Sequence, residues 1–211
     1  MTQEEENKYT RKHFHLLGWI TIIGFLASGW YYIRSDGRDP LAEFTNGINP
    51  ALQVVYGLGL GIVCAFISCW FLKRKFMEDQ LQPYIDLVKP FNLKMSDIVF
   101  VSLCAGVGEE YFFRAGLQPS WGIITTSIFF VAIHGYLNPF KKIFYYGIVL
   151  TLMICLMGWF YEKFGLISSM TAHALYDVIM FKVLVDMANA QDHVEIETPV
   201  EDDENNMDVR D

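Results

Sequence analysis

Charged side chains are scarce in this chain: they make up 19% of its 211 residues, whereas hydrophobic residues make up 53%. A soluble globular domain carries about a quarter charged residues, so this composition excludes an ordinary soluble domain. The apolar residues are also gathered into long runs, and a run of roughly 20 apolar residues spans the hydrocarbon core of a bilayer. Several such runs occur, which predicts that most of the chain lies in a membrane.

Cysteines are few and provide no disulfide or metal framework. The four of them (Cys64, Cys69, Cys104 and Cys155) all lie in apolar runs, and no CxxC spacing occurs. We therefore predict that they are small buried apolar residues. The chain also lacks an evident internal repeat.

The net charge of −8 comes from one end of the chain. From Asp186 onward there are ten acidic residues and a single basic one, Arg210, so the rest of the chain is close to neutral. We predict that residues 188–211 form an acidic, disordered tail. A solubilising end explains this composition, and a docking segment is the alternative.

The apolar runs predict an all-α fold, a polytopic bundle of about six transmembrane helices with a polar site near mid-membrane. The helices are expected at about His15–Ile33, Ala51–Leu72, Asp97–Gln118, Trp121–Leu137, Ile143–Tyr161 and Leu166–Met187. In the second, Gly57-x-Gly59-x-Gly61 allows another helix to approach closely. The predicted organisation is an N-terminal segment (residues 1–14), a membrane domain (residues 15–187) and the acidic tail.

The segment Lys73–Ser96 has apolar residues at three- and four-residue steps. This spacing predicts an amphipathic helix on the membrane surface, although a simple linker is equally compatible with it. Taken together, the segment before the first helix and the second and fourth loops contain ten lysines and arginines, whereas the other loops contain three: Arg34, Arg38 and Lys163. The positive-inside rule therefore predicts a multi-pass protein of the cell (plasma) membrane with both termini in the cytoplasm.

Glu109, Glu110 and Arg114 lie inside the third predicted helix. Ionisable groups in membrane helices are costly, and they usually line a cavity or pair with one another. Glu110 and Arg114 are four residues apart, so they share a helix face and can pair. Glu109 is rotated by about 100° and can face another partner, which makes it a candidate general base. The alternative is that all three form an ion pair that joins helices.

Two further motifs carry histidines. His134 follows Phe130 by four residues near the end of the fourth predicted helix, and His173 precedes Asp177 by four residues on the sixth. A single histidine near a helix end, such as His134, is by itself more often an interfacial or hydrogen-bonded residue than a catalytic one. The His173–Asp177 pair can bind a metal, orient an imidazole beside a reacting group, or form only a local hydrogen bond.

The three motifs are predicted to lie at similar depths in the membrane. From the helix rise, Glu109 lies roughly 18 Å, His134 roughly 10–14 Å and His173 roughly 20 Å from the cytoplasmic face of a core about 30 Å thick. A shared depth near mid-membrane favours one composite site over three unrelated features.

In this order and spacing, the motifs resemble those of the CAAX prenyl protease-like intramembrane proteases, also called the Abi or CPBP family. The matching residues are Glu109, Glu110 and Arg114, then Phe130 and His134, then His173 and Asp177. The resemblance covers about Asp97 to Phe181. It implies an intramembrane endopeptidase that acts on a membrane-associated peptide or protein. In the eukaryotic branch the activity removes the last three residues of prenylated proteins, whereas bacterial members are associated with peptide maturation, self-immunity and regulation of envelope proteins.

The resemblance also implies roles for these residues. Glu109, helped by His134, would activate the attacking water, and His173 with Asp177 would stabilise the oxyanion of the tetrahedral intermediate. Glu110, Arg114 and Phe130 would support the geometry of the site.

Family members have been described both as metalloproteases and as metal-free glutamate proteases. Glu109, His134 and His173 could hold a Zn²⁺ with an open position, and the sequence leaves both types open. Asp177 stands where the prenyl-protease branch has asparagine, which weakens the expectation of CAAX processing itself.

Two other functions remain compatible with the sequence. One is a non-catalytic membrane adaptor or bacteriocin-immunity protein that binds a partner, and the other is a proton-coupled transporter, because buried carboxylates and histidines also form proton relays. The missing repeat counts against the transporter. The expected partners are a membrane-associated substrate and the lipid bilayer, with no nucleic acid.

Overall fold

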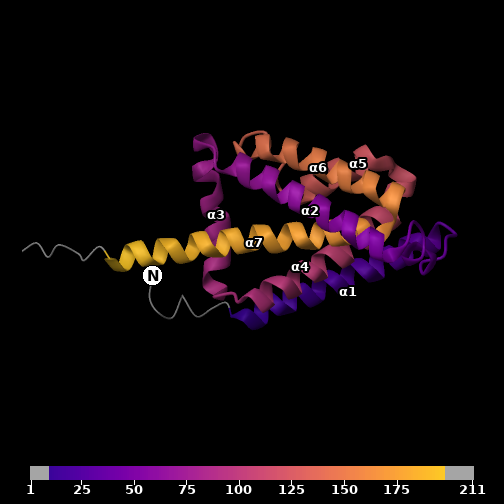
Figure 1. The fold of residues 1–211 in the computed structure, drawn as a ribbon, viewed down its shortest axis with the longest axis horizontal. Helices are drawn as coiled ribbons and strands as arrows, with labels where there is room; N and C mark the ends of the chain where they lie inside the picture. Colours follow the sequence, from indigo (N-terminus) through magenta and orange to yellow (C-terminus); the bar gives the residue numbers. More distant parts are fainter. Residues whose placement is uncertain (1–9, 198–211) are drawn as a thin grey trace, which may run out of the picture.

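The computed structural model describes residues 10–197, and every regular element in that range is helical. Six long helices form a bundle (Figure 1). They are α1 (Arg11–Ser35), α2 (Pro50–Leu72), α4 (Met95–Glu110), α5 (Gln118–Ile133), α6 (Ile143–Phe164) and α7 (Leu166–Glu197). Helix α7 runs through the middle of the bundle and contacts α2, α4 and α6. The predicted all-α class is confirmed.

Among the described residues, four segments are long and apolar enough to cross a membrane: Arg11–Ser35, Pro50–Leu72, Met95–Ile133 and Ile143–Phe164. Large apolar side chains on these segments point out of the bundle, and Phe66 and Leu152 are 71% and 67% exposed. Extensive exposed apolar surface of this kind is stable against lipid, not against water. The protein is therefore an integral membrane protein.

The segment Met95–Ile133 is long because it contains two of the predicted helices, α4 and α5, joined by the π-helix η4 (Tyr111–Leu117). The chain turns back at Gly122, whose φ of 77° and ψ of 163° lie outside the helical region. The rings of Phe113 and Phe130, on either side of this turn, lie 4.9 Å apart. Helix α5 ends at Ile133, before the predicted end at Leu137, so His134 stands directly after a helix end, where it is partly exposed.

Close packing of α2 on α7 depends on two of the three glycines that the sequence singles out. A Cβ atom at Gly57 would lie 2.5 Å from the carbonyl oxygen of Ser168, and one at Gly61 would lie 2.7 Å from that of Ala172. Gly59 faces open space, with nothing within 4 Å. Gly57 and Gly61 therefore form the small-residue face that lets the two backbones approach.

The predicted amphipathic segment forms helix α3 (Glu78–Val88) between two 3₁₀ turns, η2 (Lys75–Met77) and η3 (Lys89–Phe91). Figure 1 shows α3 crossing one end of the bundle, and it contacts α7. Ile85 and Val88 are buried, whereas Leu87 is 64% exposed. The segment is therefore a packed helix with one apolar face toward the bundle, not a simple linker.

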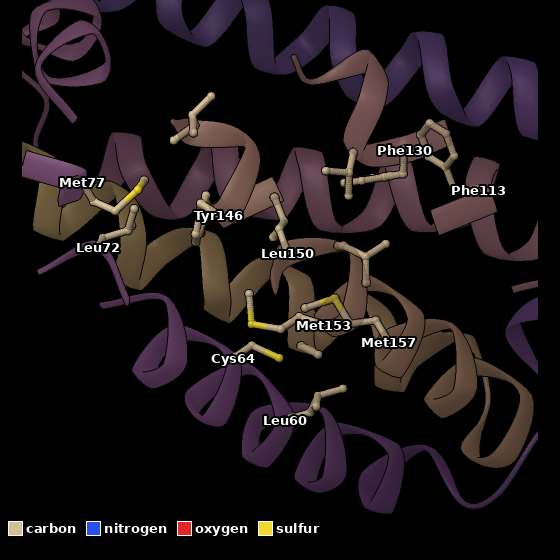
Figure 2. Packing of buried hydrophobic residues seen from close by; sticks show 14 of the residues in the cluster. Leu60, Cys64, Leu72, Met77, Phe113, Phe130, Tyr146, Leu150, Met153 and Met157 are labelled. Carbon is tan, nitrogen blue, oxygen red and sulfur yellow. The ribbon is translucent and has the colours of Figure 1, made fainter. Parts of the chain in front are cut away.

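A large apolar cluster fills the space between α2, α6 and the α4–α5 hairpin (Figure 2). It includes Leu60 and Cys64 of α2, Met153 and Met157 of α6, and Phe113 of the π-helix. All four cysteines are free: Cys64 and Cys104 are buried as predicted, while Cys69 and Cys155 are partly exposed. This cluster holds the elements that carry the histidine and glutamate motifs.

The ends of the chain differ from the prediction. Helix α1 begins at Arg11, before the expected start at His15, and α7 continues to Glu197, beyond the expected end at Met187. The first part of the predicted tail therefore continues α7. The remainder of the tail, residues 198–211, and residues 1–9 lie outside the described range.

The contrast between Gly61 and Gly59 gives a test of the α2–α7 contact. We expect Gly61→Val to lower the free energy of unfolding in detergent by about 1–3 kcal/mol, because its side chain would collide with the backbone of α7. Gly59→Val, on the same helix, should leave stability nearly unchanged. Equal effects of the two substitutions on the detergent unfolding curve would contradict this packing.

Candidate active site

The fully buried Arg114 lies in the π-helix and connects two polar side chains of the same helix face. Its Nε donates to Oε2 of Glu110 at 3.0 Å, and its Nη1 donates to Oε1 of Gln118 at 3.2 Å. Neither Glu110 nor Arg114 has any exposed side-chain surface. A buried charge is tolerated only when it is paired and hydrogen-bonded, so Glu110 serves as the counter-ion of Arg114, as the spacing predicts.

Gln118 extends this network to α6, although none of the sequence motifs includes it. Its Nε2 donates to the carbonyl oxygen of Gly158 at 3.0 Å and to Oε1 of Glu162 at 3.1 Å. The signal was available in the spacing, because Gln118 lies four residues after Arg114 and therefore on the same helix face. Gln118 fixes the arginine side chain against a second helix.

His173 of α7 joins the site through both of its ring nitrogens. Its Nδ1 lies 3.0 Å from Oε1 of Glu110, and its Nε2 lies 3.5 Å from Oδ2 of Asp177. The first contact is a hydrogen bond, whereas the second is longer than one. Both ring nitrogens therefore face carboxylate oxygens. Glu110 therefore has two partners from two helices, Arg114 and His173.

Glu109 faces the other histidine. Oε2 of Glu109 lies 3.6 Å from Nε2 of His134, and this buried oxygen has no hydrogen-bond partner among the described residues. Nδ1 of His134 lies 2.7 Å from the carbonyl oxygen of Phe130, to which it donates. Nε2 is thus the nitrogen free to exchange a proton, and a contact slightly beyond hydrogen-bond length leaves room for a bridging water.

Phe130 packs between the two histidines. Its ring stacks on that of His134, with centroids 4.4 Å apart, and meets that of His173 edge-on at 5.8 Å. Phe130 is 4% exposed, so its buried ring separates the two imidazoles. The structure therefore brings all three motifs together, and Phe130 is their common neighbour.

A group of tyrosines that the sequence analysis did not single out lies beside Asp177. Tyr136 stacks on Tyr84 of α3 with ring centroids 5.8 Å apart, and the hydroxyl of Tyr146 bonds to that of Tyr176. Burial, and then the neighbouring tyrosines and Asp177, raises the pKa of Tyr136, which keeps its phenol neutral. No sequence motif marks these residues, because tyrosines in apolar runs resemble ordinary packing residues.

The proposed metal ligands do not form a metal site in the described part of the chain. Within residues 10–197 no three histidine, cysteine or carboxylate side chains are placed so that they could hold an ion. The nitrogens of His173 face Glu110 and Asp177, and Nδ1 of His134 faces a carbonyl oxygen, so few donors remain. The arrangement of Glu109, His134 and His173 therefore does not fit a Zn²⁺ ion.

Fold and site together define a polytopic helical membrane protein that brings two histidines and three carboxylates together from different helices. Comparison with known families agrees with this class. Residues 91–179 match the family described as "Type II CAAX prenyl endopeptidase Rce1-like". That range contains Glu109, His134 and His173, together with the rest of the site motifs.

A curated relative extends the match beyond these motifs. The chain is 37% identical over 167 residues to "Uncharacterized protein YpbD" of Bacillus subtilis (strain 168), an alignment that covers 76% of this chain and 82% of YpbD. No solved structure matches the chain. The chain belongs to the Rce1-like family of type II CAAX prenyl endopeptidases, which is a family of CAAX protease-type peptidases.

The two adjacent glutamates should differ in their effect on stability. We expect Glu110→Gln to lower the free energy of unfolding by about 3–5 kcal/mol, because it leaves the buried Arg114 without its counter-ion. Glu109→Gln should cost less than about 1 kcal/mol, since Oε2 of Glu109 gives up no hydrogen bond. Unfolding of both variants in mixed micelles measures the difference, and a greater loss for Glu109→Gln would reverse the assignment.

Proposed function

We propose that this protein is an intramembrane endopeptidase that hydrolyses a peptide bond of a membrane-associated peptide or protein with water activated by Glu109 and His134. The observation that carries the proposal is the pair formed by Oε2 of the buried Glu109 and Nε2 of the partly exposed His134, 3.6 Å apart. Membership of a CAAX protease-type family supports peptidase chemistry at this pair.

The first step is activation of water. A water molecule beside the pair gives a proton to the Glu109 carboxylate while its oxygen attacks the scissile carbonyl carbon. His134 orients this water through Nε2, because its Nδ1 is held by the carbonyl oxygen of Phe130. The protonated Glu109 then gives its proton to the leaving nitrogen as the C–N bond breaks, which restores the carboxylate.

Charge on the substrate's carbonyl oxygen requires a donor, and His173 supplies it. Nδ1 of His173 is hydrogen-bonded to Glu110, whereas Nε2 only approaches Asp177 at 3.5 Å. Nε2 is therefore the atom that can turn to the developing oxyanion. Asp177 as a carboxylate would repel that oxyanion, so we assign it the orientation of His173 and not a direct contact with substrate.

The membrane placement follows from the charge distribution of the loops. We propose a multi-pass protein of the cell membrane with both termini in the cytoplasm, because the N-terminal segment and the second and fourth loops together contain more lysine and arginine than the other loops. Substrate would reach the site from the lipid bilayer. Cysteine-accessibility labelling of single cysteines placed at the exposed positions Ser35 and Lys141 tests the orientation, since these positions should be labelled from opposite sides.

Removal of either member of the pair should abolish proteolysis. We expect Glu109→Gln and His134→Ala to lower kcat by about 10²–10⁴-fold for cleavage of a membrane-peptide library in nanodiscs. Asp86→Asn, on the exposed face of α3, is the matched carboxylate control and should cleave at the wild-type rate. Cleavage products are measured by mass spectrometry on well-folded protein.

The same assay separates the competing functions. We expect a chelator to leave the rate unchanged, because Glu109, His134 and His173 do not converge on an ion. Loss of cleavage with chelator and rescue by Zn²⁺ would assign the site to metal chemistry. Full cleavage by both Glu109→Gln and His134→Ala would rule out the proposed mechanism. If the wild-type protein cleaves nothing and the Glu109→Gln variant still complements a deletion, the protein is a partner-binding adaptor.

Asp177 and His173 should respond differently to substitution. We expect Asp177→Asn to keep at least about a tenth of the wild-type kcat, because an amide can still orient His173 without repelling the oxyanion. His173→Gln should lose about 10²–10³-fold, the usual effect of removing an oxyanion donor. Steady-state kinetics in nanodiscs compares the two, and a greater loss for Asp177→Asn would show that the carboxylate itself takes part in the reaction.

A further inference from the structure

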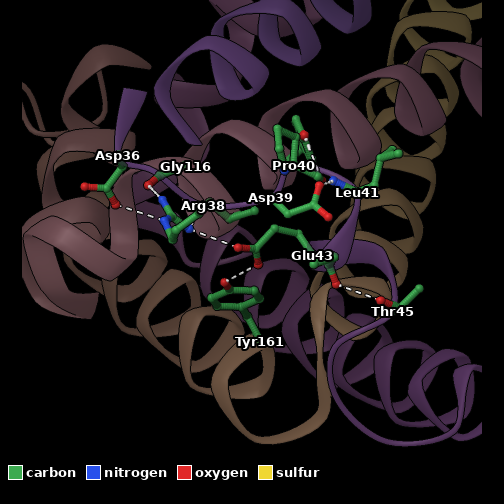
Figure 3. A network of polar contacts seen from close by, with 12 residues as sticks. Asp36, Arg38, Asp39, Pro40, Leu41, Glu43, Thr45, Gly116 and Tyr161 are labelled. Atoms are coloured by element: carbon green, nitrogen blue, oxygen red, sulfur yellow. Dashed lines mark hydrogen bonds and ion pairs between the residues drawn. The ribbon is translucent and has the colours of Figure 1, made fainter. Parts of the chain in front are cut away.

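The loop between α1 and α2 places one arginine against the end of the helix that carries Glu109 and Glu110 (Figure 3). Nη1 of Arg38 donates to the carbonyl oxygen of Ala115 at 2.6 Å, and its Nη2 donates to that of Gly116 at 2.9 Å. Arg38 is separated from both residues by more than 70 positions in the sequence. It therefore ties a distant loop to the π-helix.

The sequence explains why these carbonyl groups accept from a side chain. In an α-helix the carbonyl of Ala115 would accept from the N–H of residue 119, but residue 119 is proline and has no N–H. The helix then breaks at Gly122, so donors for the last carbonyls are scarce. The guanidinium group of Arg38 supplies these carbonyl groups with two donors in a fixed fork.

Arg38 is itself held in place by acidic side chains. Nη1 donates to Oε1 of Glu43 at 3.0 Å, and Nε donates to Oδ2 of Asp36 at 2.9 Å. Glu43 is 6% exposed and accepts a further hydrogen bond, at 3.0 Å, from the hydroxyl of Tyr161 on α6. The chain Tyr161–Glu43–Arg38 thus connects α6 to the end of the π-helix.

Other contacts fix the same loop to the same helix. The hydroxyl of Tyr111 donates to the carbonyl oxygen of Pro40 at 3.1 Å, and the ring of Tyr111 stacks on that of Phe44 with centroids 5.2 Å apart. Tyr111 follows directly after Glu110, and Ala115 follows directly after Arg114. The loop is therefore attached at both ends of the segment that orients the buried ion pair.

We propose that Arg38 and Glu43 are positioning residues for the reaction proposed above, because they hold the π-helix in the register that places Glu109 against His134 and Glu110 against His173. Arg38 acts through the backbone carbonyls of Ala115 and Gly116 and touches no substrate. This inference rests on the proposed peptidase activity for its catalytic consequence, whereas its structural part concerns the π-helix alone.

Kinetics give the first arm of the test. We expect Arg38→Gln and Arg38→Lys to lower kcat about 10- to 100-fold with KM little changed, because displacement of catalytic groups by about 1 Å costs rates of this order. Lysine fails to rescue since it lacks the two-pronged donor geometry. Glu43→Gln should act in the same direction, and the double variant Arg38→Gln/Glu43→Gln should be no slower than Arg38→Gln alone, because both substitutions break one connection.

Matched controls separate positioning from lost stability. Arg34→Gln lies on the exposed end of α1, near the same loop, and should keep wild-type kinetics. Phe14→Ala removes a buried ring at the other end of the bundle, where it packs on Phe91 and Phe181. It should lower Tm at least as much as Arg38→Gln and yet leave kcat unchanged when measured well below Tm. A kcat that follows Tm across all these variants would reduce Arg38 to a purely structural role and overturn the proposal.

Hydrogen–deuterium exchange gives the second arm, which is independent of any substrate. We expect amides of residues 111–121 to exchange about tenfold faster in Arg38→Gln than in wild type, while α2 and α7 are unchanged, because the end of the π-helix opens more often without its donors. Unchanged exchange together with unchanged kcat would refute the inference. If Arg38→Gln exchanges faster but the wild-type protein cleaves no substrate, Arg38 remains the anchor of the π-helix and only the peptidase assignment is refuted.

Discussion

A single fully buried cation determines much of this structure. Arg114 has no exposed surface, and a charge in that environment must be neutralised and hydrogen-bonded. Glu110 neutralises it from one helical turn before, and Gln118 accepts from it one turn later. Glu110 then engages His173 of α7, and Gln118 engages α6. Satisfying one arginine thus connects three helices that lie far apart in the sequence.

This requirement also gives two adjacent glutamates different roles. Glu110 is committed to Arg114 and His173, so its carboxylate serves as a fixed counter-ion. Glu109 points about 100° away around the helix and meets His134 without a direct hydrogen bond. A carboxylate of this second kind can accept a proton, and the proposed activation of water depends on that freedom. The π-helix that begins at Tyr111 lies directly beside both residues, in keeping with the frequent placement of π segments at functional sites.

Much of the fold follows from patterns that are local in sequence. Apolar runs predicted six membrane helices, and the structure has six long helices at these places within the described residues. The i, i+4 spacing of Glu110 with Arg114 predicted their contact correctly, as did that of His173 with Asp177. Helix ends were less accurate: α5 stops at Ile133, four residues before its predicted end at Leu137. The possible Zn²⁺ site at Glu109, His134 and His173 also does not form among the described residues. Spacing along one helix does not reveal which side-chain atoms already have partners on another helix.

Properties that depend on near neighbours can be read from the sequence: membrane insertion from hydropathy, the faces of each helix from its period, and the family resemblance from the ordered motifs. Which side chains meet across helices is known only from the folded chain. Three contacts join residues that are distant in the sequence. Glu109 meets His134, 25 positions away, and Glu110 meets His173, 63 positions away. Arg38 contacts the carbonyls of Ala115 and Gly116, more than 70 positions away. Such contacts arise from close helix packing at Gly57 and Gly61 and from the demands of buried polar groups, and neither leaves a periodic trace in the chain.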